Sequence, residues 1–240
     1  MIHEHSHSRL HAPLPPLIAK EVSAIQIGSG CRFIIDHITT VYQEGHYYII
    51  LELMRGGTLG SLPIPLPFIQ ARYYIAELSI ALGHLHARGV SHSDLHLENV
   101  LLDSNGHVKL TDFGFAKIQV ERPFTLAMSL SFDEDWCALG CLLYEMITGK
   151  FLALYPQGSE TQSDKFRLSF PDCIDDYLCR HFINWLVGFE LDWPKPSFET
   201  IQVHPWMKGI PWEEMKNPSE PGPILPSLLS IPPIQAALIL

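Results

Sequence analysis

Residues 92–99 and 111–114 read HSDLHLEN and TDFG, and the stretch between them reads VLLDSNGHVKL. Apolar runs at 100–102 and 108–110 flank an Asp-Ser-Asn-Gly turn, which is typical of a β-hairpin. With Asn105-Gly106 at the centre of the turn, residues whose numbers sum to 211 face each other. This register, to within one residue, places Asn99 opposite Asp112 at the open end of the hairpin.

Asp94 adds a third oxygen-bearing side chain just before the hairpin. Carboxylate and amide oxygens that converge without cysteine suit a hard cation, most naturally Mg²⁺ bound together with phosphate. A purely local reading stays open at this point, because Asp and Asn are also common in turns. The pattern therefore indicates a candidate Mg²⁺–phosphate site at Asp94, Asn99 and Asp112.

The composition narrows the class of protein. The chain has 240 residues, of which 47% are hydrophobic, so it can bury a core and is not wholly disordered. Its net charge of −10 disfavours a nucleic-acid partner. Five cysteines without a C-x-x-C pair are typical of reduced thiols. No apolar run approaches the ~18 residues of a membrane span, and no signal peptide is evident, so we expect a cytoplasmic location, with the nucleus also open.

Hydrophobic spacing predicts the other main elements. We expect helices over 18–27, 70–87, 135–148 and 174–188, and a buried strand over 46–53. From Pro211 onward the frequent prolines predict an extended tail. Histidines and prolines crowd the first 16 residues, which we interpret as a disordered tail, with weak transition-metal binding as the alternative.

HSDLHLEN followed by TDFG resembles the catalytic loop and D-F-G motif of protein kinases. Three other segments follow in the order of that family. YYIILELMRGG at 47–57 is similar to the last strand of the small lobe and the hinge, and DWCALG at 135–140 to the start of the central large-lobe helix. HPWMKGIPW at 204–212 is similar to the junction with the C-terminal tail of AGC-type Ser/Thr kinases, the ribosomal-protein kinases among them. The resemblance covers about residues 18–215.

The resemblance implies an α+β, protein-kinase-like fold with an incomplete small β N-lobe and a mostly helical C-lobe. We therefore expect four segments, namely a disordered His- and Pro-rich tail at 1–17, a truncated N-lobe at 18–54, a C-lobe at 55–210, and a Pro-rich, AGC-like tail at 211–240. The oligomeric state cannot be read from the sequence.

The resemblance also implies a role for each residue of the candidate site. Asp94 would orient the substrate hydroxyl and accept its proton, and Asn99 and Asp112 would hold Mg²⁺ against the phosphates of ATP. Asp94 and Asn99 are thus the expected catalytic residues.

Nucleotide binding would involve a second group of residues. Met54 and the backbone near Glu52 would contact the adenine edge, and Leu101 would form the floor of the pocket. Glu21 lies where the glutamate of the regulatory helix is expected, with an ordinary surface glutamate as the alternative. Asp135 would be structural and would accept backbone N–H bonds beneath the catalytic loop.

Several cationic elements of the kinase pattern are missing. No lysine occurs between Lys20 and Lys109, so the strand lysine is absent, and Gly28-Ser29-Gly30 is interpreted as a loop after a helix rather than as a phosphate loop. His96 replaces the phosphate-contacting lysine, and an imidazole is mostly neutral at pH 7. Ser93 replaces the arginine of the catalytic loop, and no A-P-E occurs between Asp112 and Asp135.

Three hypotheses follow. The favoured one is a pseudokinase, or a catalytically impaired kinase, that acts as a binding or scaffold module for a protein partner. The second is an active ATP-dependent Ser/Thr kinase that uses Asp94, Asn99 and Asp112 on a protein substrate. The third is a truncated product of a kinase gene, with exposed sheet edges that favour aggregation or a partner.

Overall fold

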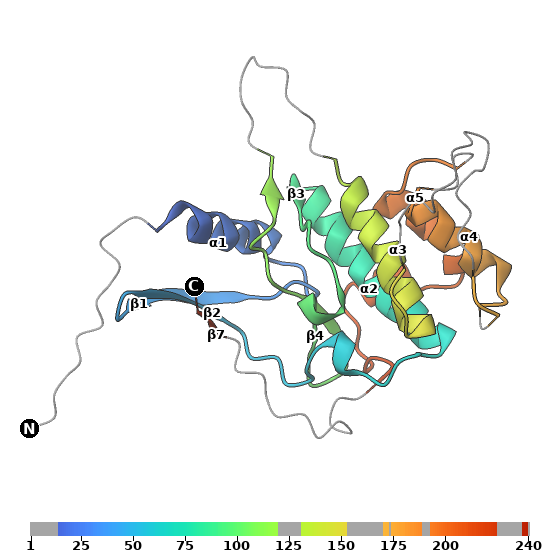
Figure 1. The fold of residues 1–240 in the computed structure, drawn as a ribbon, viewed down its shortest axis with the longest axis horizontal. Helices are drawn as coiled ribbons and strands as arrows, with labels where there is room; N and C mark the ends of the chain where they lie inside the picture. The colour runs from blue at the N-terminus through green and yellow to red at the C-terminus, as the bar shows by residue number, and fades with distance from the viewer. Residues whose placement is uncertain are drawn as a thin grey trace, which may run out of the picture.

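The computed structural model describes residues 14–119, 131–152, 170–172, 174–188, 193–224 and 237–239, and gives only the backbone of the last range. Residues 1–13, which hold most of the expected His- and Pro-rich tail, lie outside the described residues. One helix lies over a small sheet at one end of the molecule, and a larger helical block forms the other end (Figure 1). No helix in the described ranges is long and apolar enough to cross a membrane.

The smaller part contains α1 (Pro16–Gly28), β1 (His37–Gln43) and β2 (His46–Leu51). α1 begins two residues before the expected helix and ends at Gly28, and Ser29-Gly30 form the turn that follows, so Gly28-Ser29-Gly30 lies at the end of a helix as predicted and is not a phosphate loop. β1 and β2 pair antiparallel around Glu44-Gly45, where both residues have positive φ. Such a two-residue turn matches the twist of a hairpin. The sequence predictions did not include β1, although its run HITTVY is rich in β-branched residues.

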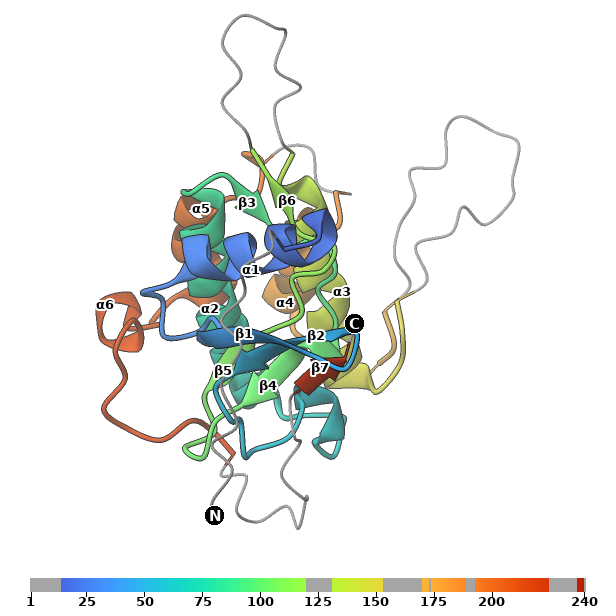
Figure 2. The ribbon, with the colours of Figure 1, turned by 90° about the vertical axis from the view of Figure 1, so that its left-hand side faces the viewer.

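A third strand, β7 (Ala237–Ile239), joins this sheet from the opposite end of the chain. It pairs antiparallel with β2, with Leu238 opposite Ile49, and gives the strand order β1-β2-β7 (Figure 2). The prediction of an extended tail after Pro211 did not include this strand pairing, and it was wrong for α6 (Trp212–Met215), which is helical. These elements have four and three residues, too few for a periodic signal.

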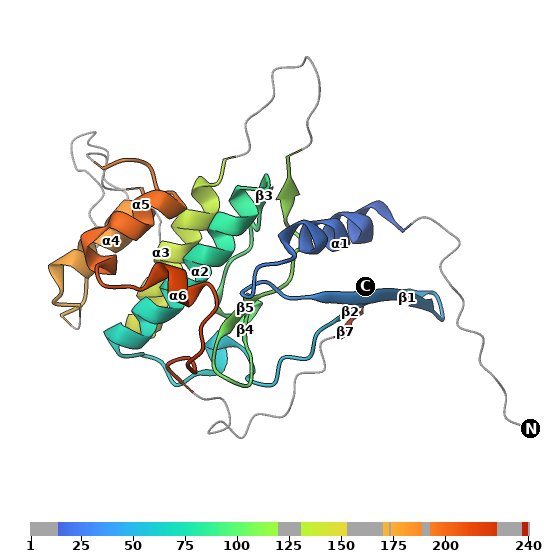
Figure 3. The same cartoon turned by 180° about the vertical axis from the view of Figure 1, so that it is seen from behind.

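The larger part is built around α2 (Phe68–His86) and α3 (Asp133–Thr148). Its other helices are α4 (Tyr177–Leu186) and α5 (Phe198–Val203), and α6 lies beside α2 when the molecule is seen from behind (Figure 3). The helices expected over 70–87, 135–148 and 174–188 are confirmed to within a few residues. Gly149 ends α3 in the left-handed conformation with φ of 68°, which a glycine adopts without strain. Short elements connect these helices: η1 (Leu59–Ser61), β3 (Val90–Ser91), η2 (Leu97–Asn99), β4 (Val100–Leu102), β5 (Val108–Leu110), β6 (Lys117–Ile118) and η3 (Pro205–Met207).

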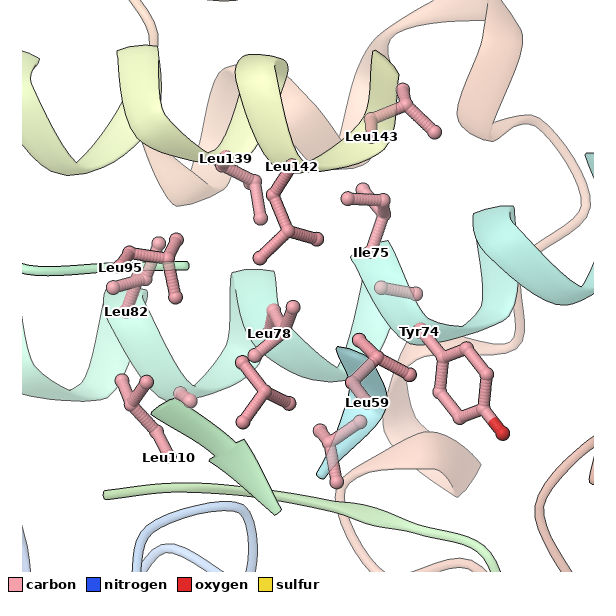
Figure 4. Close-up of a cluster of buried hydrophobic side chains, with 14 of the residues drawn as sticks. Leu59, Tyr74, Ile75, Leu78, Leu82, Leu95, Leu110, Leu139, Leu142 and Leu143 are labelled. Carbon is pink, nitrogen blue, oxygen red and sulfur yellow. The ribbon is translucent and has the colours of Figure 1, made fainter. Parts of the chain in front are cut away.

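The main core lies between α2, α3 and the β4–β5 hairpin. Leu139 and Leu142 of α3 point toward α2, and Leu110 of β5 lies on the other side of that helix (Figure 4). Ile75 and Leu78 of α2 are fully buried between them. Each such side chain contributes about 1.5–3 kcal/mol to stability through burial. The β4–β5 hairpin and the loop that precedes the hairpin therefore pack on α2, which holds them in place.

The β4–β5 hairpin is confirmed, but its register is one residue from the centred prediction. Val100 pairs with Leu110, so facing residues sum to 210. The shift follows from Asp103, whose side chain accepts the N–H groups of Asn105 at 2.8 Å and His107 at 3.0 Å and so centres the turn on Asn105. Asn99 is thus level with Thr111, which donates its N–H to the Asn99 carbonyl at 3.0 Å.

Candidate active site

Asp135, in the first turn of α3, holds the loop that precedes Asp94. Its Oδ1 accepts the N–H of Ser93 at 2.7 Å, and its Oδ2 accepts the N–H of His92 at 2.9 Å and the hydroxyl of Ser91 at 3.0 Å. His86 of α2 places Nε2 2.8 Å from the same oxygen. Burial alone would raise the pKa of Asp135, but these hydrogen bonds outweigh it and lower the pKa. The structural role predicted for Asp135 is confirmed, and His86 is a partner that sequence reasoning missed.

The structure brings Asp94 and Asn99 together. The side-chain amide of Asn99 donates to the Asp94 carbonyl at 2.9 Å and to Asp94 Oδ2 at 3.1 Å. Ser93 holds the left-handed conformation with φ of 63°, a strained backbone for a non-glycine residue, and the bond to Asp135 fixes it there. The carboxylate of Asp94 is partly exposed. Its position is fixed by Asn99 on one side and by the bond between Ser93 and Asp135 on the other.

Asp112 begins a tight turn at the end of β5. Its φ is 60°, and its Oδ1 accepts the N–H of Gly114 at 3.2 Å. Phe113 is fully buried and meets the ring of His92 edge-on at 4.9 Å between centroids. His92 in turn places Nε2 2.9 Å from the Thr111 carbonyl, and burial lowers its pKa, so it stays neutral. These contacts lock the D-F-G turn to the catalytic-loop segment.

Glu21 of α1 lies beside Asp112. A Cβ atom added to Gly114 would lie 3.3 Å from Asp112 Oδ1 and 3.9 Å from Glu21 Oε2, so the three residues meet at one point. Glu21 is only 4% exposed. Burial, and then the charge of Asp112, raise its pKa to about 6, against a smaller opposing effect of Lys20. The ion pairs found among the described residues include none between Glu21 and a lysine or arginine.

Met54 and Leu101 lie in the same buried core, and the segment after Met54 is tied to β4. Gly56 donates its N–H to the Leu102 carbonyl at 2.9 Å, so the expected hinge is fixed to the hairpin. The side chain of Glu52 points to other partners: it accepts the Asp36 N–H at 2.9 Å and pairs with Lys109 Nζ.

Lys109 is the next lysine after Lys20 in the chain, and its position explains why it cannot stand in for the missing strand lysine. Its ammonium group binds Glu52, lies 3.6 Å from Asp36 Oδ2 and donates to the Ile34 carbonyl at 3.4 Å. The charge of Lys109 is therefore used at the hinge rather than at Asp112. Sequence reasoning did not find this ion pair, because the sequence of β5 does not indicate whether Lys109 faces the small lobe or the large lobe.

The arrangement suits a weakly held hard cation. No three His, Cys, Asp or Glu side chains in the described ranges cluster so as to hold a metal ion. Asn99 uses its amide nitrogen on Asp94, so its Oδ1 is the atom that could bind a metal, together with the Asp112 carboxylate. Two side-chain oxygens fit Mg²⁺, which takes most of its ligands from water and phosphate.

Positive charge is scarce around these oxygens. His96 places Nε2 3.6 Å from Asp94 Oδ2, and Lys117 is paired with Glu134 on the surface. Among the ion pairs of the described residues, no lysine or arginine reaches Asp94 or Asp112. Among the described residues, the site therefore presents carboxylate and amide oxygens without a lysine or arginine paired to Asp94 or Asp112.

Comparisons with known proteins agree with this geometry. The model of the protein kinase domain family matches residues 6–207. The mouse cAMP-dependent protein kinase catalytic subunit PRKX is 30% identical over 218 residues, which cover 82% of this chain and 61% of that protein. Yeast cAMP-dependent protein kinase type 3 is 30% identical over 79% of this chain and 54% of its own length. Human ribosomal protein S6 kinase alpha-2 is also 30% identical, over 79% of this chain and 30% of its own length.

The chain belongs to the protein kinase family. Within that family it is of the AGC type, as its similarity to the cAMP-dependent and ribosomal S6 kinases indicates. Its α+β architecture of a small sheet with one helix and a larger helical block is the kinase fold predicted from the sequence. The chain spans about three fifths of the length of the PRKX relative.

Proposed function

We propose that this protein kinase domain acts as a binding or scaffold module for a protein partner and transfers phosphate poorly or not at all. The observation that carries the proposal is the environment of Glu21. A buried carboxylate beside Asp112, without a paired lysine or arginine among the described residues, leaves two acidic groups facing the same space. Transfer of a phosphoryl group relies on positive charge that stabilises the developing negative charge.

A nucleotide phosphate entering this space meets repulsion from Glu21 and Asp112. Two unit charges about 4 Å apart interact with roughly 4 kcal/mol at an effective dielectric constant near 20. Mg²⁺ held by Asn99 and Asp112 offsets part of this repulsion, and among the ion pairs of the described residues no lysine or arginine reaches Asp112 to supply more. The lack of cations therefore weakens nucleotide binding and slows phosphoryl transfer.

Residual nucleotide binding would use the residues that the family resemblance assigns. Met54 and the backbone near Glu52 contact adenine, Leu101 forms the floor, and Asn99 and Asp112 hold Mg²⁺ against ATP. Support comes from the placement of Met54 and Leu101 in one buried core and from the engagement of the Glu52 side chain with Lys109. Asp94 orients the substrate hydroxyl whenever transfer occurs.

An active Ser/Thr kinase is the second candidate. The hydrogen-bonded conformation of the catalytic loop favours it. The contacts of Asp94 with Asn99 and of Ser93 with Asp135 hold the base and one metal ligand in fixed positions. Such preorganisation is what a catalytic loop needs. In this candidate a partner protein supplies the missing cation, and the cytoplasm or nucleus is the place where that partner acts.

A thermal-shift titration with ATP, with and without Mg²⁺, tests the proposal. A ligand that binds only the native state raises the melting temperature by mass action. We expect no saturable Mg²⁺-dependent rise below millimolar ATP. A clear rise at micromolar ATP that is lost in Asp112→Ala and kept in the control Asp175→Ala, at an exposed position, would contradict the proposal and favour the active kinase.

A further inference from the structure

Two cysteines on α3, far from the D-F-G turn in the sequence, form a thiol pair. Cys137 and Cys141 are four residues apart in a continuous helix, so they lie on one face, one turn apart. Both are half-buried, and the one-turn spacing lets the Cys141 thiol donate to a thiolate at Cys137. Neither takes part in the candidate active site.

Cys137 also lines a cavity of about 360 Å³ next to α3. The walls are largely apolar and come from Trp185, Leu186, Trp193, Pro194 and Pro196. Trp185 donates its indole N–H to the Pro194 carbonyl at 2.7 Å, and the two tryptophan rings meet at 5.9 Å between centroids. These two contacts hold Trp185, Trp193 and Pro194 together in one apolar wall, a lining typical of small-molecule sites.

Lys195 and Asp133 also line the cavity. Their side chains are largely exposed, and the Lys195 ammonium lies 3.4 Å from Asp133 Oδ2. The cavity thus combines an apolar wall with a solvated polar pair. A ligand with an apolar chain and a polar reactive group matches this division.

We propose that Cys137 is a modification site for apolar α,β-unsaturated carbonyl compounds, with Cys141 as the residue that activates it and the adjacent cavity as the site that receives the apolar chain. The hydrogen bond from the Cys141 thiol stabilises the Cys137 thiolate. It outweighs the effect of burial and lowers the pKa of Cys137 to about 7, while the pKa of Cys141 is raised.

The reaction is a conjugate addition that needs no further reagent. The Cys137 sulfur forms a bond to the β-carbon, the carbon–carbon π bond breaks, and the resulting enolate takes a proton from solvent at the α-carbon. The thiol proton released on ionisation balances the proton taken up. Both cysteines keep their oxidation state, and Cys141 keeps its hydrogen.

A disulfide between the same two residues is disfavoured by the helix itself. Side chains at positions i and i+4 have Cβ atoms about 5–6 Å apart, whereas a disulfide needs a separation of about 3.5–4.5 Å. Oxidation would require α3 to unwind at its buried centre. The pair therefore stays reduced and available to a carbon electrophile.

Labelling of the full chain with N-octylmaleimide and N-methylmaleimide, two probes with the same reactive group, tests the proposal. The extent of reaction at each cysteine is followed by mass spectrometry, with Cys31 as the matched control because it is half-buried and its pKa is raised by burial. We expect the octyl-to-methyl rate ratio at Cys137 to exceed that at Cys31 by about tenfold, since the cavity buries several CH₂ groups of the octyl chain.

Cys141→Ala provides the second arm. We expect the labelling rate of Cys137 at pH 7 to fall roughly three- to tenfold and the pH midpoint to rise toward that of an ordinary thiol. Cys141→Ser, which keeps a donor, should retain most of the rate and remains informative if the alanine variant unfolds. Equal octyl-to-methyl ratios at Cys137 and Cys31, or a pH profile of Cys137 that neither variant changes, would overturn the proposal.

Discussion

Glu21 and Asp112 meet as two carboxyl groups at the point where α1 approaches the D-F-G turn, and burial, followed by the charge of Asp112, raises the pKa of Glu21. In the kinase pattern a lysine would lie between these charges, whereas in the described part of this chain Lys109 is bound to Glu52. The inner side of the site is acidic as a result, which sets its chemistry apart from that of a nucleotide pocket built around a lysine.

We expect Glu21→Gln to stabilise the protein at neutral pH. The folded-state pKa of about 6 lies above the ordinary value of 4.5, so the ionised form costs stability. This cost is absent below pH 4.5, grows as the pH rises through 6 and then stays constant, at about 2 kcal/mol. Thermal denaturation at pH 4 and pH 8 should show a gain for the variant only at pH 8.

Glu214→Gln is the matched control for Glu21→Gln, because Glu214 is exposed on α6. Its unfolding free energy should stay within about 0.5 kcal/mol of the original protein at both pH values. A loss of stability in Glu21→Gln at pH 8 would contradict the account, since it would mean that the carboxylate has a favourable partner.

Acid should destabilise the large lobe through His204. Burial, and then the neighbouring His181, lower the pKa of His204 to about 4, and its ring stacks on Trp185 at 5.3 Å. The unfolded chain takes up this proton below about pH 6.5 and the folded chain only near 4, so stability falls as the pH drops through that window, on the order of 2–3 kcal/mol.

His204→Asn tests this acid effect, because asparagine can still accept the Trp206 N–H that His204 Nδ1 accepts at 3.1 Å. The variant should be less stable at pH 7, through lost packing, but should show a flatter decline between pH 6.5 and 4 in urea denaturation. His46→Asn, at an exposed position, should leave the slope unchanged. An unaltered slope in His204→Asn would assign the acid effect to other groups.

Asp135→Asn should loosen the catalytic loop. The substitution replaces one oxygen by a donor that faces the N–H groups of Ser93 or His92, and an unsatisfied buried donor costs about 1–3 kcal/mol. Amide hydrogen exchange should accelerate over residues 91–94. Asp133→Asn, on the exposed first turn of the same helix, should not accelerate it. Unchanged exchange in Asp135→Asn would show that the left-handed Ser93 does not depend on this carboxylate.

Removal of residues 237–240 should uncover the edge of β2. Unpaired strand edges promote association between chains, and β7 covers the edge of β2 opposite to β1. Light scattering after size-exclusion chromatography should show an increase in dimers or larger species relative to the full chain. A shortened chain that remains in the same state as the full chain would show that β7 does not protect the sheet.

The sequence predicted local elements well and their partners poorly. Helical spacing predicted α2 and α3, and the turn signal predicted the β4–β5 hairpin, because these features depend on neighbouring residues. Hydrogen bonds to the Asp103 side chain shift the hairpin register by one residue, and the spacing of residues in the sequence does not reveal this shift. The pairing of β2 with β7 links positions almost 190 residues apart and leaves no local pattern.

The candidate site shows the same division. Asp94, Asn99 and Asp112 belong to motifs that the sequence displays openly, and the structure places Asp94 against Asn99 and Glu21 beside Asp112. The Lys109–Glu52 pair and the bond from His86 to Asp135 depend on which faces of distant elements pack together. These two contacts could be identified only once the three-dimensional fold was known.

A phosphotransfer assay tests the central claim most directly. The full chain, Asp94→Ala and a cAMP-dependent protein kinase as the active control are each incubated with radiolabelled ATP, Mg²⁺ and a mixture of protein substrates. We predict that the full chain transfers no more phosphate, to itself or to the substrates, than Asp94→Ala does. Transfer well above the Asp94→Ala level would contradict the account and establish this domain as an active kinase.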